Sequence, residues 1–370
     1  MVKIFGHQFA AIALACALVM PASAQSGEPD PAKVADYKTL QRLDQRLADV
    51  GFRIQKNATP WCPQTEYVLG WVVTDRLQYP TGDQSAVARS YGTSWPGASD
   101  FVIAAVAKDS PASRNKFHVG EAVLAIDDYD LATATADEPD TKKSKRARKK
   151  GQSFDRMAAV EAAMLERFAD GAANIRIQSP VKPGQGLSVA ATIPIQLERV
   201  CASLISLHVG SSLSAGADGR RVRINHKLAV YAADDAELAW IVAHELSHNI
   251  LGHPQRLNKA KINRGLFQEF GKSAKLTRQT EDEADRLSIW LMVKAGYDPQ
   301  AGIRFWERYG PEHDSPLIRS ATHSRWKDRI ETLRSEIGTA TSALARDANA
   351  RPPMLAANAV AKSQTSQKGK

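Results

Sequence analysis

Two histidines and a glutamate lie close together in the second half of the chain, in the order His244-Glu245-Leu246-Ser247-His248. Residues four apart on an α-helix project from one face, so both imidazoles can bind the same ion. Neutral imidazole is a good zinc ligand, and two of them leave the metal short of its usual four partners. Glu245 directly follows the first histidine and can take a proton from a water molecule at the metal. The pattern predicts the zinc-binding and catalytic residues of a metalloprotease.

A helix is expected to carry these residues. Asp234 with Glu237 resembles a capping box, and Gly252 and Pro254 are residue types found just past a helix C-terminus. An apolar face is supplied by Leu238, Ile241, Val242, Ala243, Leu246 and Ile250. The alternative is an ordinary amphipathic helix with two surface histidines, and a third ligand elsewhere in the chain would decide against it.

A second helical pattern, which runs to Gly296, opens with the carboxylates of Glu281-Asp282-Glu283-Ala284-Asp285. Glu281 and Asp285 are four apart and share a face, so one can bind zinc while the other braces a ligand histidine. Glu283 points elsewhere. With a threonine before this run, the pattern favours Glu283 as a helix-capping carboxylate.

These motifs resemble the HtpX/BepA/CAAX-prenyl-protease family of zinc metalloendopeptidases. The likeness rests on residues 218–222, residues 235–238 and the HELSHNILGH segment, and it covers about residues 196–337. The resemblance implies one zinc ion per chain, with Glu281 as the third ligand after His244 and His248. It also implies that Asp285 is the aspartate of the family's E-x-x-x-D motif. A third ligand of this kind favours a metalloprotease over the bare amphipathic helix.

A third segment of the family pattern is T-H-P-x(4)-R, in which the histidine and the arginine lie near the active site. Thr322-His323 and Arg329 resemble it, with Ser324 in place of the proline. The resemblance makes His323 and Arg329 candidate electrophiles for the oxyanion that forms during peptide hydrolysis.

His253 raises a second interpretation, because HExxH followed by another histidine suggests the metzincin arrangement. That pattern has its glycine three residues after the second histidine and its last histidine six residues after. Gly252 and His253 stand at four and five. The spacing excludes the metzincin arrangement and favours His253 as a surface residue at the helix end.

Length and composition indicate an exported protein with more than one module. The chain has 370 residues, of which 43% are hydrophobic, and is long for one domain. Residues 1–24 predict a signal peptide, with Lys3 before an apolar run and Ala22-Ser23-Ala24 as the cleavage site. Cleavage there is preferred to lipoprotein processing at Cys16. Since no later run is long enough to span a membrane, we expect a periplasmic protein, soluble or peripheral, as in the BepA-like branch.

Two cysteines remain after the signal peptide, Cys62 and Cys201, and in an exported chain they are expected to form a disulfide. Residues 63–195 between them resemble the PDZ domain of HtrA-type proteases. A strand at residues 102–106, the turn Ser110-Pro111-Ala112, and Gly120-Glu121 within the segment 119–126 carry this likeness, and a helix over residues 154–169 would complete the domain. PDZ folds bind extended peptides at a sheet edge, and the alternative is a spacer that binds nothing.

We therefore predict an α+β fold, in which a mainly helical zincin-type metallopeptidase domain with a small β-sheet is interrupted by a PDZ-like β-rich domain. Residues 25–62 supply a helix of the peptidase over residues 34–54, residues 196–338 supply the rest of it, and residues 339–370 form a disordered tail. The formal net charge is +9, and much of it lies in the run 142–150. In an exported protein this run excludes a nucleic-acid role and indicates a solvated loop or a contact with anionic lipid headgroups.

The predicted substrates are polypeptides, in particular unfolded or misassembled envelope proteins such as outer-membrane proteins. The strand at residues 221–225 is expected to border the cleft and to pair with the substrate backbone. One alternative is a zinc-containing chaperone or scaffold with little proteolytic turnover, and Glu245 argues against it because ligation alone does not need that carboxylate. Another is an intramembrane-type processing protease, which the missing membrane spans disfavour.

Overall fold

The computed structural model describes residues 28–134 except 94 and 96, then 155–180, 188–262, 272–313 and 326–356. The proposed signal peptide, the basic run 142–150 and His323 lie outside these residues. Helices and small sheets alternate along the described chain, so the α+β class is confirmed. The described part contains no helix that is long and apolar enough to cross a membrane.

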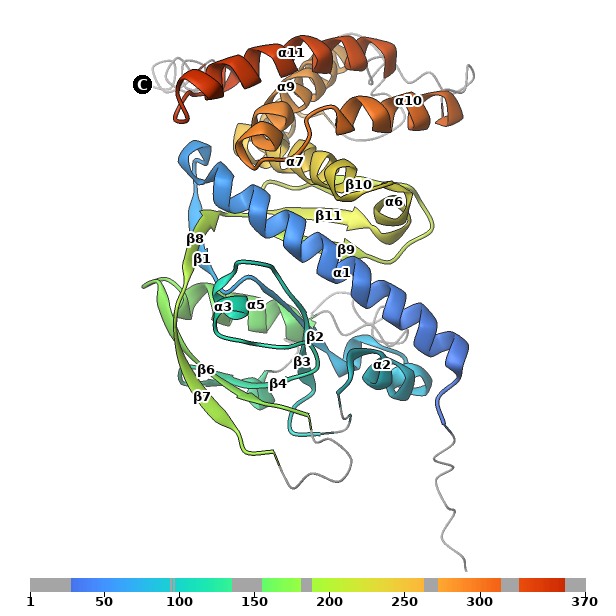
Figure 1. Cartoon of the computed structure of the whole chain (residues 1–370), viewed down its shortest axis with the longest axis vertical. Coiled ribbons are helices and arrows are strands. Elements are labelled where there is room, and N and C mark those ends of the chain that lie inside the picture. The colour runs from blue at the N-terminus through green and yellow to red at the C-terminus, as the bar shows by residue number, and fades with distance from the viewer. Residues whose placement is uncertain are drawn as a thin grey trace, which may run out of the picture.

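One long helix, α1 (Pro31–Ala58), runs between a helical body and a β-rich body (Figure 1). The Asp30 side chain accepts a hydrogen bond from the Ala32 amide at its N-terminus, and Pro31 occupies the first turn, where its missing N–H is no loss. The helix predicted at residues 34–54 is confirmed and is longer than expected. Its apolar face packs into the helical body through Leu47 and Ile54.

Among the described residues after Cys201, the helical body continues with a three-stranded sheet and a series of helices. The strands are β9 (Leu204–His208), β10 (Ala215–Ala217) and β11 (Arg221–Asn225), and the helices are α6 (His226–Tyr231), α7 (Asp235–Leu251), α8 (His253–Lys259), α9 (Lys272–Lys294), α10 (Ala301–His313) and α11 (Trp326–Arg346). Helices α7 and α9 pack closely on each other, and α11 packs on α9. One core joins α1, the sheet, α6, α7 and α9 to α11, with Leu238, Leu246, Leu287, Ile289 and Leu333 among its fully buried side chains.

The pairing of β11 contradicts one expectation. This strand is the middle of the sheet: β10 binds one edge antiparallel and β9 binds the other edge parallel. Both rows of backbone groups are therefore used, and β11 cannot pair with a substrate. The prediction for residues 221–225 was wrong because alternating polar and apolar residues indicate a strand but not its neighbours.

The β-rich body holds an antiparallel sheet in the order β2-β3-β4-β6-β7, with β5 on β4. It has its own core, which includes Phe101, Ile103, Ile126 and Ile175. Its strands are β2 (Trp71–Asp75), β3 (Phe101–Val106), β4 (Ala122–Ile126), β5 (Tyr129–Asp130), β6 (Ala172–Gln178) and β7 (Ala191–Gln196). Its helices are α2 (Gln84–Tyr91), α3 (Pro111–Arg114), α5 (Asp155–Arg167) and the short 3₁₀ turns Arg76–Gln78, Thr81–Asp83 and Leu131–Thr133.

The two chain segments that link the helical body to the β-rich body lie side by side. After the 3₁₀ turn Thr59–Trp61, β1 (Thr65–Val68) pairs antiparallel with β8 (Glu198–Cys201), and Cys62 and Cys201 form the predicted disulfide with Cα atoms 5.5 Å apart. Helix α1 also binds the β-rich body directly, because Gln45 donates to the Val106 carbonyl and accepts from the Val106 amide. The β-rich body is therefore held by hydrogen bonds to α1 as well as by the β1–β8 pair and the disulfide.

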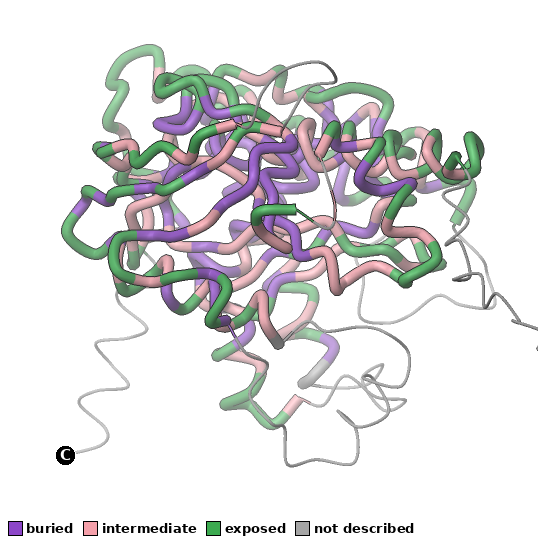
Figure 2. Tube along the Cα trace, turned by 90° about the horizontal axis from the view of Figure 1, so that it is seen from below, coloured by how far each residue is buried: buried purple, intermediate pink, exposed green. Residues whose placement is uncertain are grey.

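The C-terminal region is more ordered than its composition indicates. Helix α11 extends to Arg346, Ala340 is fully buried, and Met354 packs against the helical core. The prediction of a disordered tail from residue 339 is wrong for residues 339–356, because small alanine side chains pack on a helix face without a strong apolar signal. Residues 357–370 lie outside the described part. Figure 2 shows the buried segments gathered inside the molecule, with exposed segments at its periphery.

Candidate metal centre

Helix α7 carries both motif histidines, and its two ends are set by local side chains. Asp234 Oδ1 accepts a hydrogen bond from the Glu237 amide at 2.8 Å, as the capping pattern predicts. The buried Glu237 carboxylate also binds Arg308 of α10 at 2.6 Å. At the other end, Gly252 has φ +67°, a left-handed conformation that glycine adopts without strain.

Asn249 fixes the helix against the sheet, a role that the motif by itself does not predict. Its amide donates to Ser203 Oγ at 2.7 Å and to the Arg221 carbonyl at 3.2 Å, and its Oδ1 accepts from the Gly219 amide at 2.7 Å. These bonds join the turn that carries His248 to both β11 and the segment after Cys201. The signal available in the sequence was an asparagine directly after the second histidine of the motif.

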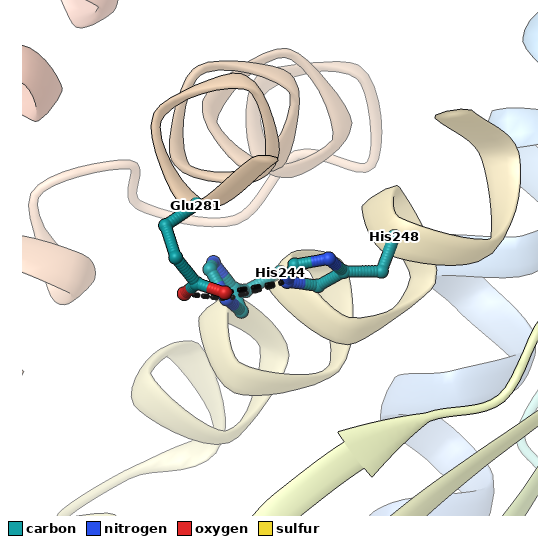
Figure 3. A group of neighbouring side chains, drawn as sticks. All are labelled: His244, His248 and Glu281. Carbon is teal, nitrogen blue, oxygen red and sulfur yellow. Dashed lines mark hydrogen bonds and ion pairs between the residues drawn. The ribbon is translucent and has the colours of Figure 1, made fainter. Parts of the chain in front are cut away.

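Helix α9 brings a carboxylate to the two imidazoles (Figure 3). His244 Nε2 and His248 Nε2 lie 3.2 Å apart. Glu281 Oε2 lies 3.5 Å from His244 Nε2, and Glu281 Oε1 lies 3.6 Å from His248 Nε2. The structure therefore places together the three side chains that the sequence proposed as ligands.

The spacing of these atoms fits a zinc ion. Ligand atoms about 2.0–2.1 Å from zinc at tetrahedral angles lie about 3.4 Å from one another. The two imidazole nitrogens are 3.2 Å apart, and the distances of 3.5 and 3.6 Å to the two oxygens of Glu281 are also close to this value. Two imidazoles and one carboxylate are also a donor set that zinc accepts, and they leave a fourth position for water or substrate.

Asp285 binds the outer nitrogen of the first histidine. Its Oδ1 lies 3.0 Å from His244 Nδ1, one turn along α9 from Glu281. Arg329 of α11 binds both oxygens of the same carboxylate, and its Nη1 lies 3.7 Å from Glu281 Oε2. Burial opposes a charge on His244, but the hydrogen bonds to Asp285 and Glu281 outweigh it and raise the pKa of His244 to about 10. The carboxylates around His244 therefore favour a positive charge at this position.

A second chain of contacts supports the other histidine. His253 Nδ1 lies 2.9 Å from His248 Nδ1, and His253 Nε2 lies 3.1 Å from Glu283 Oε2. Arg256 Nη1 lies 2.9 Å from the same oxygen. Burial lowers the pKa of His248 to about 3, so its imidazole is neutral, as a metal ligand must be.

Two expectations about this region were wrong. His253 is fully buried, not a surface residue, because the left-handed Gly252 turns the chain and α8 begins at once beneath His248. Glu283 is not a helix cap, because α9 begins at Lys272 and places Glu283 well inside the helix, facing α8.

The formal charges around the three ligands also suit a divalent cation. With both histidines neutral, as they would be when they bind a metal, Glu245, Glu281 and Asp285 carry three negative charges and Arg329 carries one positive charge, which leaves −2. Glu245 is half-buried on the same helix as the histidines. Among the sequence candidates, Arg329 thus lies in the site, beside Asp285, while His323 is outside the described residues.

Comparisons with known proteins find distant similarity over part of this chain. No family model matches this chain. It is 30% identical over 108 residues, 24% of this chain and 31% of the relative, to the mitochondrial metalloendopeptidase OMA1 of Saccharomyces cerevisiae. It is 26% identical over 147 residues, 31% of this chain and 30% of the relative, to the putative beta-barrel assembly-enhancing protease of Vibrio cholerae. The chain therefore matches about a third of each relative, at 31% and 30%. This distant likeness and the His-His-Glu group together indicate a metallopeptidase.

Proposed function

We propose that this chain is an exported zinc metalloendopeptidase that cleaves unfolded or misassembled envelope polypeptides. The observation that carries the proposal is the near-tetrahedral spacing of His244 Nε2, His248 Nε2 and Glu281, with a glutamate directly after the first histidine. The disulfide between Cys62 and Cys201 supports an oxidising compartment. The similarity to two metalloproteases supports the reaction class.

The side chains divide the chemistry between them. A zinc ion held by His244, His248 and Glu281 would lower the pKa of a water molecule and polarise the carbonyl of the scissile peptide. Glu245 accepts the proton of the attacking water and passes it to the leaving amine. Asp285 keeps the first imidazole oriented. Arg329 and His323 are the candidate groups for the oxyanion.

Substrate backbone requires a free strand edge near α7, and β10 supports this role better than β11. Within the described residues, β10 pairs with β11 on one side only, and it packs against α7. A peptide added to this edge would be held by main-chain hydrogen bonds, which tolerate many sequences. Such recognition suits unfolded polypeptides.

A second binding surface is proposed in the β-rich body. A groove of about 360 Å³ lies between β2 and α5, and α1 and β9 close its far side. Strand β2 has a sheet neighbour only in β3 among the described strands, so its outer edge faces this groove. Apolar side chains line much of it, including Leu47, Phe52, Trp71, Met164 and Ile205. These features support a PDZ-like site that binds an extended apolar peptide.

The test of the reaction is digestion of casein and of an unfolded outer-membrane protein by wild type and by Glu245→Gln. The variant removes the base and no ligand, so zinc content stays near one per chain while cleavage falls by about 10²-fold or more. Equal cleavage by both proteins would reject the proposed mechanism. A zinc-loaded wild type that binds unfolded protein without cutting it would instead support the chaperone or scaffold alternative.

A further inference from the structure

We propose that His253 is a positioning residue for His248, anchored for that role by Glu283 and Arg256. The inference rests on the proposed zinc site and adds a residue to it. His253 is fully buried, and its ring lies against that of His248 with centroids 4.9 Å apart. A buried, polar side chain in this place needs partners for both of its ring nitrogens.

The hydrogen bonds allow one arrangement of protons. His248 Nε2 faces His244 and Glu281, so it is the nitrogen that would bind the metal and it carries no hydrogen. His248 Nδ1 then carries the hydrogen and donates it to His253 Nδ1 at 2.9 Å. His253 Nε2 therefore carries the second hydrogen and donates it to Glu283 Oε2 at 3.1 Å. In this series of hydrogen bonds from His248 to Glu283, every donor meets one acceptor.

Glu283 is itself fixed from two helices. Arg256 of α8 binds its Oε2 at 2.9 Å, and Gln279 of α9 donates to its Oε1 at 2.8 Å. The charges of Glu283 and Arg256 cancel, so this support adds no net charge beside the metal site. The neutral imidazole of His253 thus orients His248 by accepting its hydrogen bond. Glu283 and Arg256 hold this imidazole in place.

The two ligand histidines are supported in parallel ways. Each outer nitrogen leads to a carboxylate that an arginine binds: directly to Asp285 and Arg329 for His244, and through His253 to Glu283 and Arg256 for His248. Groups that hold a ligand histidine in this way commonly raise metal affinity about 10- to 100-fold. We assign that contribution to His253.

The test compares two substitutions in the full-length protein. His253→Phe keeps a ring of similar size and removes both nitrogens, whereas the amide of His253→Gln can still accept from His248 and donate to Glu283. Zinc affinity is measured by competition with a chromophoric chelator, and ligand geometry by the absorption spectrum of the Co²⁺-substituted protein. We expect His253→Phe to lose about 10- to 100-fold in zinc affinity with an altered Co²⁺ spectrum. His253→Gln should stay near wild type in both.

Folding is followed by circular dichroism of the same samples. If His253→Phe does not fold, His253→Met, with an adaptable apolar side chain, replaces it with the same expectation. Wild-type affinity and an unchanged Co²⁺ spectrum in a folded His253→Phe variant would overturn the assignment and leave the proposed function standing. A wild-type protein that binds no zinc would instead reject the proposed function itself.

Discussion

The guanidinium of Arg329 binds both carboxylate oxygens of Asp285, with Nε–Oδ2 and Nη2–Oδ1 distances of 2.6 Å each. Both side chains are buried, and they come from different helices. The planar fork of arginine matches a carboxylate in this two-bond geometry, which lysine cannot reproduce. This pair therefore fixes α11 to α9 directly behind His244.

Removal of one member of this pair should be strongly destabilising. Arg329→Leu leaves the Asp285 charge buried and without its main partner, so we expect a loss of about 3–5 kcal/mol in the free energy of unfolding. Urea unfolding followed by circular dichroism measures it. The double variant Arg329→Leu/Asp285→Leu should recover most of the loss, since no unpaired charge remains. A single variant as stable as wild type would contradict the importance of the pair.

The third ligand can be tested against its neighbour on the same helix. Glu281→Ala should lower bound zinc well below one per chain, because it removes a ligand that two imidazoles cannot replace. Asp282→Ala is the matched control: its side chain is 43% exposed and binds Arg286, away from the site. Metal analysis after gel filtration distinguishes them. Equal zinc loss in both variants would show that the register of α9 has been misread.

The disulfide should contribute to stability through the unfolded chain. Cys62 and Cys201 are 139 residues apart, so the bond removes many conformations from the unfolded state. Replacing both by serine should lower the free energy of unfolding by about 2–5 kcal/mol. Denaturant unfolding of the oxidised wild type and the variant measures this difference. Complete alkylation of both cysteines in the native, oxidised protein would contradict the bond.

A bulky residue in the groove of the β-rich body should separate recognition from chemistry. Ala162 is exposed on α5 and lines the groove, so Ala162→Trp fills it without disturbing the core. Cleavage of a full-length unfolded protein should fall, while cleavage of a short unstructured peptide stays near wild type. Glu166→Trp, also exposed on α5 but not lining the groove, controls for the added ring. Unchanged rates on both substrates would indicate a spacer.

Asp44 of α1 should make stability depend on pH. Burial raises its pKa from 3.8 to about 7, against the hydrogen bond to Tyr91. The folded state therefore holds a proton that the unfolded state releases above about pH 4. Stability falls as pH rises from about 4 to 7, by at most about 1.4 kcal/mol per pH unit, and then levels off.

The variant Asp44→Asn removes this titration. It should match wild type at pH 4 and exceed it in thermal stability at pH 8. Asp36→Asn, at an exposed position of the same helix, should have the thermal stability of wild type at both pH values. An Asp44→Asn protein with the same pH profile as wild type would show that the carboxyl is ionised throughout.

Helical periodicity was sufficient to predict the ligand face of the site. His244 and His248 share a face of α7, and Glu281 and Asp285 share a face of α9, because residues four apart on a helix always do. That these two faces meet could not follow from periodicity. It came from a resemblance to a known family, and the distances between the side chains came only from the structure.

The errors arose where the chain leaves regular geometry or where packing decides. The turn at Gly252 brought His253 under His248, and no helical spacing describes that contact. Glu283 was misread because the start of α9 was placed too late. Met354 is buried by long-range packing against the helical core, which composition does not report. For His253 and Met354 the missing information was a tertiary contact, and for Glu283 it was the start of the helix.

The position of α1 has a consequence for the order in which the molecule is made. This helix precedes the β-rich body in the chain, yet the strands and helices that cover its apolar face follow the whole β-rich body. All 139 residues from Cys62 to Cys201 must emerge before the later chain can cover this face. During that time the face of Leu47 and Ile54 has no partner from the later chain. Substitutions that slow folding of the β-rich body should therefore lower the yield of the protein more than the stability of its finished form.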